Sequence, residues 1–365
     1  MFFFSKKSGE GPALSRIRSG KRATVFHLGM PKTGTTHIQS LSRANEAKLL
    51  SEGVLYPNVR KEIGDFAHHS LSGDLADKLA GGQSIGDYSA LEGRKEHIVL
   101  SSEGFSELSN GGMKSLAGLH PARDRFGVLY FRDLAGFARS FTQELVKHGW
   151  PESFTTAVYA DHLRTFAFDP TKLHLGNQLP VAQRCVAAFG DRGSIFVAYN
   201  NVVDQGDDLF VHFWQQVIGI ETKSMSTVAP FPNRHVGFDV LETNRLLNVA
   251  LVGVDDSPGP WAHRWLLDNL SEIRNEMPEL HRLADYRESA PVDAGEGIAL
   301  ETERQLFKQY AGQFVNAAGA GRIFQRDHRT VLEWADIERF CKDHPVVVQK
   351  MQTLARKCSK DALRD

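Results

Sequence analysis

Apolar positions along the chain fall into short continuous runs that are followed by longer segments with a helical period. The first run covers 24–28 and stops at Gly29, after which Ile38 and Leu41 recur at spacings near one helical turn. A short apolar run next to a turn signal is typical of a buried parallel strand. The pattern therefore predicts a strand, a tight turn and a helix.

The same alternation continues through the first two thirds of the chain. Further strands are predicted at 53–57, 97–101, 126–131 and 194–199, and helices at 134–148, 152–166, 180–189 and 207–217. Residues 58–95 read as a loop with a short helix, and the pattern beyond about 236 is mainly helical. Strands that alternate with helices favour an α/β fold with a parallel sheet.

The distribution of charge and periodicity predicts three parts. Residues 1–22 form a flexible basic tail, 23–330 form the main domain with its helical part from about 236, and 331–365 form a helical extension. The tail has six basic residues against one acid. A second interpretation of the tail is peripheral contact with an anionic membrane surface.

Composition excludes several classes of protein. The 365 residues include 43 Lys plus Arg and 44 Asp plus Glu, a balance that argues against a nucleic-acid partner, which would need a basic excess. Three cysteines without a C-x-x-C pair fit neither a disulfide framework nor a zinc site. No run approaches the roughly 18 apolar residues of a transmembrane segment. We expect a cytoplasmic protein.

The segment 29–36, G-M-P-K-T-G-T-T, lies between the first strand and the first long helix. Backbone N–H groups at the start of a helix lack partners, and the helix dipole adds positive charge there, so this position favours a bound phosphate. Lys32 supplies a full charge, and the hydroxyls of Thr33, Thr35 and Thr36 can donate hydrogen bonds. The segment predicts a phosphate-binding loop.

The order of residues separates this loop from a Walker A motif, in which lysine follows the second glycine. Here Lys32 precedes Gly34, and P-K-T-G-T-T resembles the 5′-phosphosulfate loop of sulfotransferases that use 3′-phosphoadenylyl sulfate (PAPS). The resemblance implies a three-layer parallel sheet with a P-loop-NTPase-like sulfotransferase architecture and a helical C-terminal region. It also implies PAPS as donor co-substrate, with no metal. The donor-binding residues that it implies in this loop are Pro31, Lys32, Thr33, Gly34, Thr35 and Thr36.

The resemblance extends to the residues that hold the nucleotide 3′-phosphate. Sulfotransferases place an arginine at a strand end and a serine eight positions later, and Arg132 and Ser140 match that pattern. Arg234 lies where many members carry a basic loop, although the usual Arg-Lys-Gly order is absent. In all, the similarity runs from about residue 24 to about residue 324.

A sulfotransferase also needs a general base to take the proton of the acceptor hydroxyl, and members of the family use His or Glu. Glu103 follows the strand at 97–101, at the sheet edge where open α/β proteins bind ligands. His68 and His69 are the alternative, since histidine suits proton transfer near neutral pH. Helix capping or ion pairing would equally explain Glu103, and a solvated loop would explain either histidine. We favour Glu103.

Taken together, the resemblance implies an enzyme that transfers the sulfuryl group of PAPS to a hydroxyl by in-line displacement, with Lys32 stabilising the leaving phosphate. The acceptor that it implies is a carbohydrate or glycolipid. Two alternatives stay open: a P-loop-type nucleotide-dependent kinase, and a non-catalytic module that binds a nucleotide or glycan.

Overall fold

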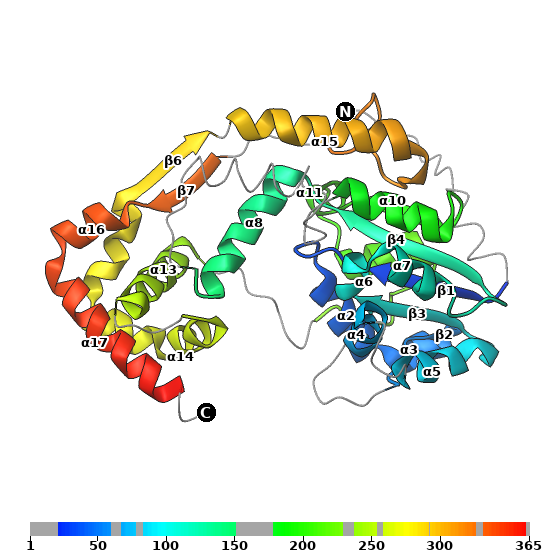
Figure 1. Ribbon diagram of the computed structural model, residues 1–365, viewed down its shortest axis with the longest axis horizontal. Coiled ribbons are helices and arrows are strands. Elements are labelled where there is room, and N and C mark those ends of the chain that lie inside the picture. The colour runs from blue at the N-terminus through cyan, green and yellow to red at the C-terminus, as the bar shows by residue number, and fades with distance from the viewer. Residues whose placement is uncertain are drawn as a thin grey trace. The chain divides into compact units, whose positions relative to one another are not determined.

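The structure is a computed structural model that describes most of the chain (Figure 1). The described residues are 21–59, 67–77, 83–150, 178–228, 237–253, 258–291, 293–325 and 331–362. The chain divides into two compact units. The first comprises Met1–Leu134, Thr165–Asn233 and Ala299–Asp327, and the second comprises Ala135–Arg164, Arg234–Ile298 and His328–Asp365.

A five-stranded parallel sheet forms the centre of the first unit, in the order β2-β3-β1-β4-β5 (Figure 1). The strands are β1 (Ala23–Leu28), β2 (Val54–Leu55), β3 (His97–Ser102), β4 (Asp124–Phe131) and β5 (Ser194–Ala198). The bounds of each strand agree to within two residues with those of a strand predicted from an apolar run, so the predicted α/β class is confirmed.

Side chains of β1 alternate between the two faces of the sheet, as the period of a strand requires. Phe26 and Leu28 join one hydrophobic cluster, together with residues of the helices α7 and α10. Ala23 and Val25 join the other, together with residues of α2 and of the π-helical segment η2. Helices on both faces of a parallel sheet make the predicted three layers.

Helices of the first unit connect and cover these strands. They are α2 (Thr35–Ala44), α3 (Glu46–Ser51), α4 (His69–Asp77), α5 (Gln83–Ser89), η1 (Ala90–Gly93), α6 (Gly104–Glu107), α7 (Asn110–Ala117), α10 (Gln178–Phe189), α11 (Tyr199–Asp204), α12 (Leu209–Val211), η2 (His212–Ile218) and η4 (Ala311–Gln313). Residues 58–95 thus hold more helix than predicted. The helix predicted at 207–217 is a single α-turn followed by η2, and the one predicted at 152–166 lies outside the described residues.

The second unit is mainly helical, as predicted, but it also contains a small antiparallel sheet that the periodicity did not indicate. Its elements are α8 (Leu134–Lys147), α13 (Phe238–Val252), α14 (Pro260–Glu276), η3 (Pro278–Tyr286), β6 (Arg287–Pro291), β7 (Val331–Ala335), α16 (Ile337–Asp343) and α17 (Pro345–Ala362), and α15 (Asp293–Tyr310) runs from this unit into the first. β6 pairs with β7 across more than forty residues, with Ser289 opposite Glu333. The helical extension predicted at 331–365 therefore begins with a strand, over its first five residues.

A buried ion pair joins the small sheet to the helices of the second unit. Arg245 of α13 donates from Nε to Glu242 at 2.9 Å and from Nη2 to the carbonyl of Ala335 in β7. Burial raises the pKa of Glu242, and Arg245 opposes that shift.

Among the described helices, none is long and apolar enough to cross a bilayer. The domain boundaries predicted at 22 and 330 stay predictions.

Candidate functional site

The predicted phosphate loop follows β1 at the carboxyl edge of the sheet, and its first residue is fixed from two sides. Gly29 donates its backbone N–H to the carbonyl of Ser102 at 3.0 Å, and its own carbonyl lies 3.0 Å from the Ser106 hydroxyl. A Cβ at Gly29 would lie 2.4 Å from Cγ2 of Thr35, so the close packing of the loop onto its helix requires glycine here.

Threonine side chains inside the loop hold its curvature. Thr33 and Thr35 are buried, and both donate from Oγ1 to the carbonyl of Met30, at 2.6 and 3.1 Å. Their hydroxyls are thus committed to the loop itself, and what they can offer a ligand is their backbone N–H groups. Thr36, the last threonine of the loop, is half-buried.

Two residues of the loop have the left-handed backbone conformation. Lys32 has φ 63° and Gly34 has φ 75°, and Gly34 is the N-cap of α2. Such a conformation costs a non-glycine residue about 1–3 kcal/mol, which is typical of functional loops. The turn brings the chain directly into α2, where the N–H groups of Thr35 and Thr36 precede the first intrahelical hydrogen bond. The loop therefore presents backbone amides and one ammonium at the end of β1.

Arg132, the first residue after β4, contacts this loop. Its Nη1 donates to the carbonyl of Lys32 at 3.0 Å, and its guanidinium lies 5.4 Å from the centre of the Tyr199 ring. Gln178 of α10 donates from its side chain to the carbonyl of Arg132. The guanidinium predicted to bind a phosphate is thus half-buried beside the phosphate loop.

The two other residues assigned to the 3′-phosphate remain predictions. Ser140 is a half-buried residue of α8 and belongs to the second unit, whereas Arg132 belongs to the first. Arg234 lies outside the described residues.

Glu103, the favoured base, follows β3 directly. It is half-buried and stands at the N-cap position of α6, with φ −64° and ψ −38°. Its side chain makes no capping hydrogen bond to α6, so the capping interpretation of this carboxylate finds no support there. Because the preceding residue, Ser102, accepts the N–H of Gly29, Glu103 lies at the same sheet edge as the loop.

His68, one of the alternative bases, is buried, and both of its ring nitrogens are hydrogen-bonded to the backbone. Its Nδ1 accepts the backbone N–H of Ser101 at 2.9 Å, and its Nε2 donates to the carbonyl of Pro57 at 3.0 Å. The ring lies between Tyr56 and Tyr88, with centroids 4.9 and 5.7 Å away. These contacts join the segment before α4 to β3, a role that needs no proton transfer.

His69 is exposed and begins α4. Its Nδ1 lies 3.0 Å from the hydroxyl of Ser102, which also lies 3.1 Å from the Ser72 hydroxyl and accepts the N–H of Gly104 at 3.2 Å. His69 and Glu103 therefore flank Ser102 at the carboxyl end of β3. Of the two histidines, His69 has the geometry that suits a base.

A pair that the sequence analysis missed supports the first turn of α2. His37 Nε2 lies 2.9 Å from Oδ2 of Asp208, whose Oδ1 caps α12 by accepting the N–H groups of Phe210 and Val211. Burial raises the pKa of Asp208, but the hydrogen bonds from His37 and from these amides outweigh it, so the net pKa is lowered. The one signal in the sequence was that His37 directly follows the loop.

A buried polar network lies beneath the loop. His27 Nδ1 is 2.8 Å from the hydroxyl of Ser101, to which Gln39 of α2 donates at 3.0 Å. Complete burial lowers the pKa of His27 to about 3, so the ring is neutral at physiological pH. The network ties β1 and β3 to α2, the three elements that carry the loop.

Comparison with known proteins adds one solved structure. No family model matches the sequence, and no curated protein matches it. The sulfotransferase from Alicyclobacillus acidocaldarius is similar at 15% identity, with a TM-score of 0.36, over 63% of this chain and 92% of that chain. An alignment at this identity assigns a role to no residue of this chain.

Proposed function

We propose that this protein is a PAPS-dependent sulfotransferase that transfers a sulfuryl group to the hydroxyl of a carbohydrate or glycolipid. The observation that carries the proposal is the loop 29–36, where P-K-T-G-T-T turns from β1 into α2 through left-handed residues and leaves amides at the helix start. Charge-assisted hydrogen bonds of the kind that such a loop offers contribute about 1.5–3 kcal/mol each. Several of them suffice to hold the phosphosulfate.

The chemistry assigned to these residues is a single in-line displacement. The acceptor oxygen attacks sulfur as the bond between sulfur and the bridging phosphate oxygen breaks, and adenosine 3′,5′-bisphosphate leaves. Lys32 and the amides of α2 stabilise the charge that develops on that oxygen. The acceptor proton passes to Glu103 or to His69, which both stand at the end of β3 beside the loop.

Arg132 is assigned to the 3′-phosphate of the nucleotide. Its guanidinium has five N–H donors in a planar fork, so it can hold the Lys32 carbonyl and still donate to a phosphate. Ser140 and Arg234 are proposed to complete that site. The bound 3′-phosphate would then stabilise the loop that holds the 5′-phosphosulfate, through the shared arginine.

Calorimetric titration with adenosine 3′,5′-bisphosphate tests the donor site. We expect binding in the presence of EDTA, and an affinity at least about tenfold weaker in the Lys32→Gln variant. Lys95→Gln is the matched control, because Lys95 is an exposed lysine just before β3, remote in sequence from the loop. Strict preference for ATP with magnesium would instead identify a kinase.

Transfer is tested separately from binding. The protein is incubated with sulfur-labelled PAPS and a panel of hydroxyl-bearing sugars and glycolipids, and labelled product is measured. Label on an acceptor supports the sulfotransferase, and its loss in Lys32→Gln places the reaction at the loop. Tight nucleotide binding without transfer to any acceptor would identify a non-catalytic binding module.

A further inference from the structure

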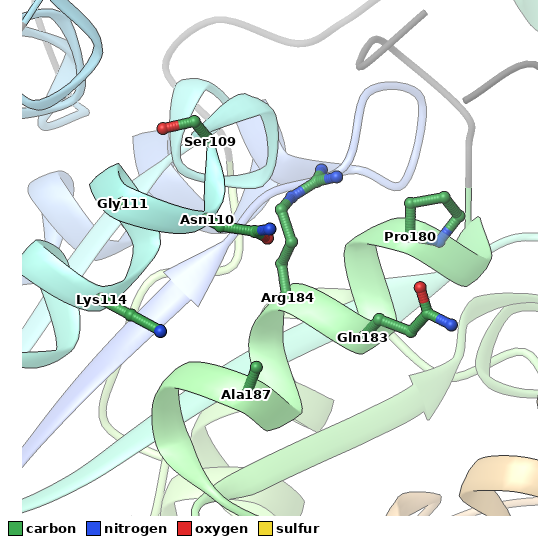
Figure 2. A pocket seen from close by; sticks show the side chains of 8 residues that line it. All are labelled: Ser109, Asn110, Gly111, Lys114, Pro180, Gln183, Arg184 and Ala187. Atoms are coloured by element: carbon green, nitrogen blue, oxygen red, sulfur yellow. The ribbon is translucent and has the colours of Figure 1, made fainter. Parts of the chain in front are cut away.

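A pocket of 680 Å³ lies between α7 and α10 in the first unit, and it has no part in the proposed transfer (Figure 2). Of the residues that the structure describes, eight line it: Ser109, Asn110, Gly111, Lys114, Pro180, Gln183, Arg184 and Ala187. None of them belongs to the loop 29–36, and none is a residue assigned to the base or to the 3′-phosphate. The pocket is therefore a separate feature of the same unit.

The lining has a strong excess of positive charge. It contains the ammonium of Lys114 and the guanidinium of Arg184, and none of the eight lining residues is acidic. The N-cap of α7, Ser109, and its first residue, Asn110, also line the pocket, as does Pro180 of α10. The N-terminal turn of α7 therefore adds partial positive charge at the pocket.

Arg184 is a nearly buried cation in the wall of the pocket. Only 5% of the residue is exposed, and its Nη2 donates to the carbonyl of Ser106 at 3.0 Å. Its Nε is enclosed and has no hydrogen-bond partner among the described residues. A nearly buried guanidinium is costly unless an anion compensates its charge. Figure 2 shows this side chain extending from α10 past Asn110 of α7, along the wall of the pocket.

Neutral side chains complete a donor-rich surface. The amides of Asn110 and Gln183 and the hydroxyl of Ser109 can each donate a hydrogen bond. Ser109 already accepts the N–H of Gly112 as the N-cap of α7, which leaves its hydroxyl hydrogen for another acceptor. An occupant that accepts on several oxygens and carries negative charge would satisfy this lining.

We propose that this pocket binds an oxyanion, a sulfate, phosphate or carboxylate group, between Lys114 and Arg184. The pocket lies next to the phosphate loop 29–36. Arg184 donates to the carbonyl of Ser106, and the hydroxyl of Ser106 donates to the carbonyl of Gly29. The same chemistry has two sources, a free inorganic anion or the anionic group of a larger molecule. The site itself depends on neither the PAPS reaction nor its acceptor.

Titration with sodium sulfate at constant ionic strength tests the site, observed by NMR of the nitrogen-labelled full chain. We expect saturable shifts of the Arg184 Nε–H resonance and of the side-chain amides of Asn110 and Gln183. Lys114 is exposed, so Lys114→Gln should fold normally and weaken the affinity about fivefold or more. Lys95→Gln should leave the affinity unchanged.

Two results would overturn the proposal. One is the absence of saturable shifts at these three side chains up to 100 mM sulfate, and the other is an undiminished affinity in Lys114→Gln. An Arg184→Lys variant, which keeps the charge and removes the planar fork of guanidinium donors, provides a second test, because it should also bind sulfate more weakly. Neither readout requires PAPS, so the site and the proposed transfer fail or succeed separately.

A second arm identifies the source of the anion. A disaccharide that contains glucuronate is compared with its glucose counterpart and with inorganic sulfate. Tighter binding of the glucuronate compound than of sulfate, with no binding of the neutral sugar, supports an anionic group on a larger molecule. Equal or tighter binding of sulfate supports a free anion, and both results support the oxyanion site.

Discussion

Arg132 donates from Nη1 to the carbonyl oxygen of Lys32 at 3.0 Å, across 100 residues of sequence. The acceptor belongs to a lysine with φ 63°, a left-handed conformation that a residue other than glycine rarely adopts. The bond therefore fixes the orientation of the peptide that leads to Thr33. A residue proposed to bind the nucleotide therefore also shapes the loop that is proposed to bind its other end.

Replacing Arg132 tests this double role. In Arg132→Lys the positive charge remains but the planar fork is lost, so the three donors of a single compact ammonium have to reach both the Lys32 carbonyl and the ligand. We expect the affinity for adenosine 3′,5′-bisphosphate to fall about tenfold or more, measured by calorimetry. The free energy of unfolding should change by less than about 1.5 kcal/mol, the usual net value of a single hydrogen bond.

The strand that precedes Arg132, β4, offers a matched control for Arg132→Lys. Arg125 of β4 also donates from Nη1 to a backbone carbonyl, that of Ala117 at 2.7 Å, but it lies at the opposite end of the strand from the loop. Arg125→Lys should therefore bind the nucleotide like the unaltered protein. Equal affinities in the two arginine variants would remove Arg132 from the nucleotide site.

Gly34→Ala should destabilise the loop through two effects. The backbone has φ 75°, and a Cβ would lie 2.3 Å from Cδ1 of Leu209. Gly53 has φ 79° with nothing within 4 Å of a Cβ, so Gly53→Ala measures the conformational effect alone, about 1 kcal/mol. In urea unfolding, Gly34→Ala should lose clearly more stability than Gly53→Ala. Equal losses would mean that Leu209 moves aside without cost.

Replacing Glu103, the proposed general base, should lower the rate of transfer and leave nucleotide binding intact. We expect Glu103→Gln to reduce the transfer rate about 10²- to 10⁴-fold, the usual contribution of a general base, with an unchanged affinity for adenosine 3′,5′-bisphosphate. Glu107→Gln, at the end of the same short helix, is the control and should retain its rate. Full activity in Glu103→Gln together with loss of activity in His69→Ala would transfer the role to His69.

The sheet and the loop could be predicted because their signals are local. Each strand of the first unit contains a short, mainly apolar run, and the loop combines Lys32 and Gly34 within a few residues. The pair β6 and β7 could not be predicted in this way. These strands are short and partly polar, and their pairing depends on residues more than forty positions apart.

The roles of individual side chains at the site were harder to predict, for the same reason. Adjacent histidines have opposite environments, since His68 is buried between two tyrosines and His69 is exposed at the sheet edge. The bond from His37 to Asp208 joins residues 171 positions apart, and neither residue belongs to a recognisable motif. Periodicity reports which face of an element is apolar, and it contains no information on such distant partners.

The buried ring of His27 predicts a specific dependence of stability on pH. Burial lowers its pKa from 6.5 to about 3, so between these values the unfolded chain takes up a proton that the folded chain does not. This difference lowers the free energy of unfolding by about 1.4 kcal/mol for each pH unit below 6.5, until the folded state also protonates near pH 3.

His27→Gln removes that contribution, so its urea-unfolding free energy should fall less steeply than that of the unaltered protein between pH 6.5 and pH 4.5. The control His148→Gln, at a side chain that is 57% exposed, should keep the original slope. Identical slopes in the unaltered protein and in His27→Gln would show that His27 protonates in the folded state, and that the network beneath the loop opens to water.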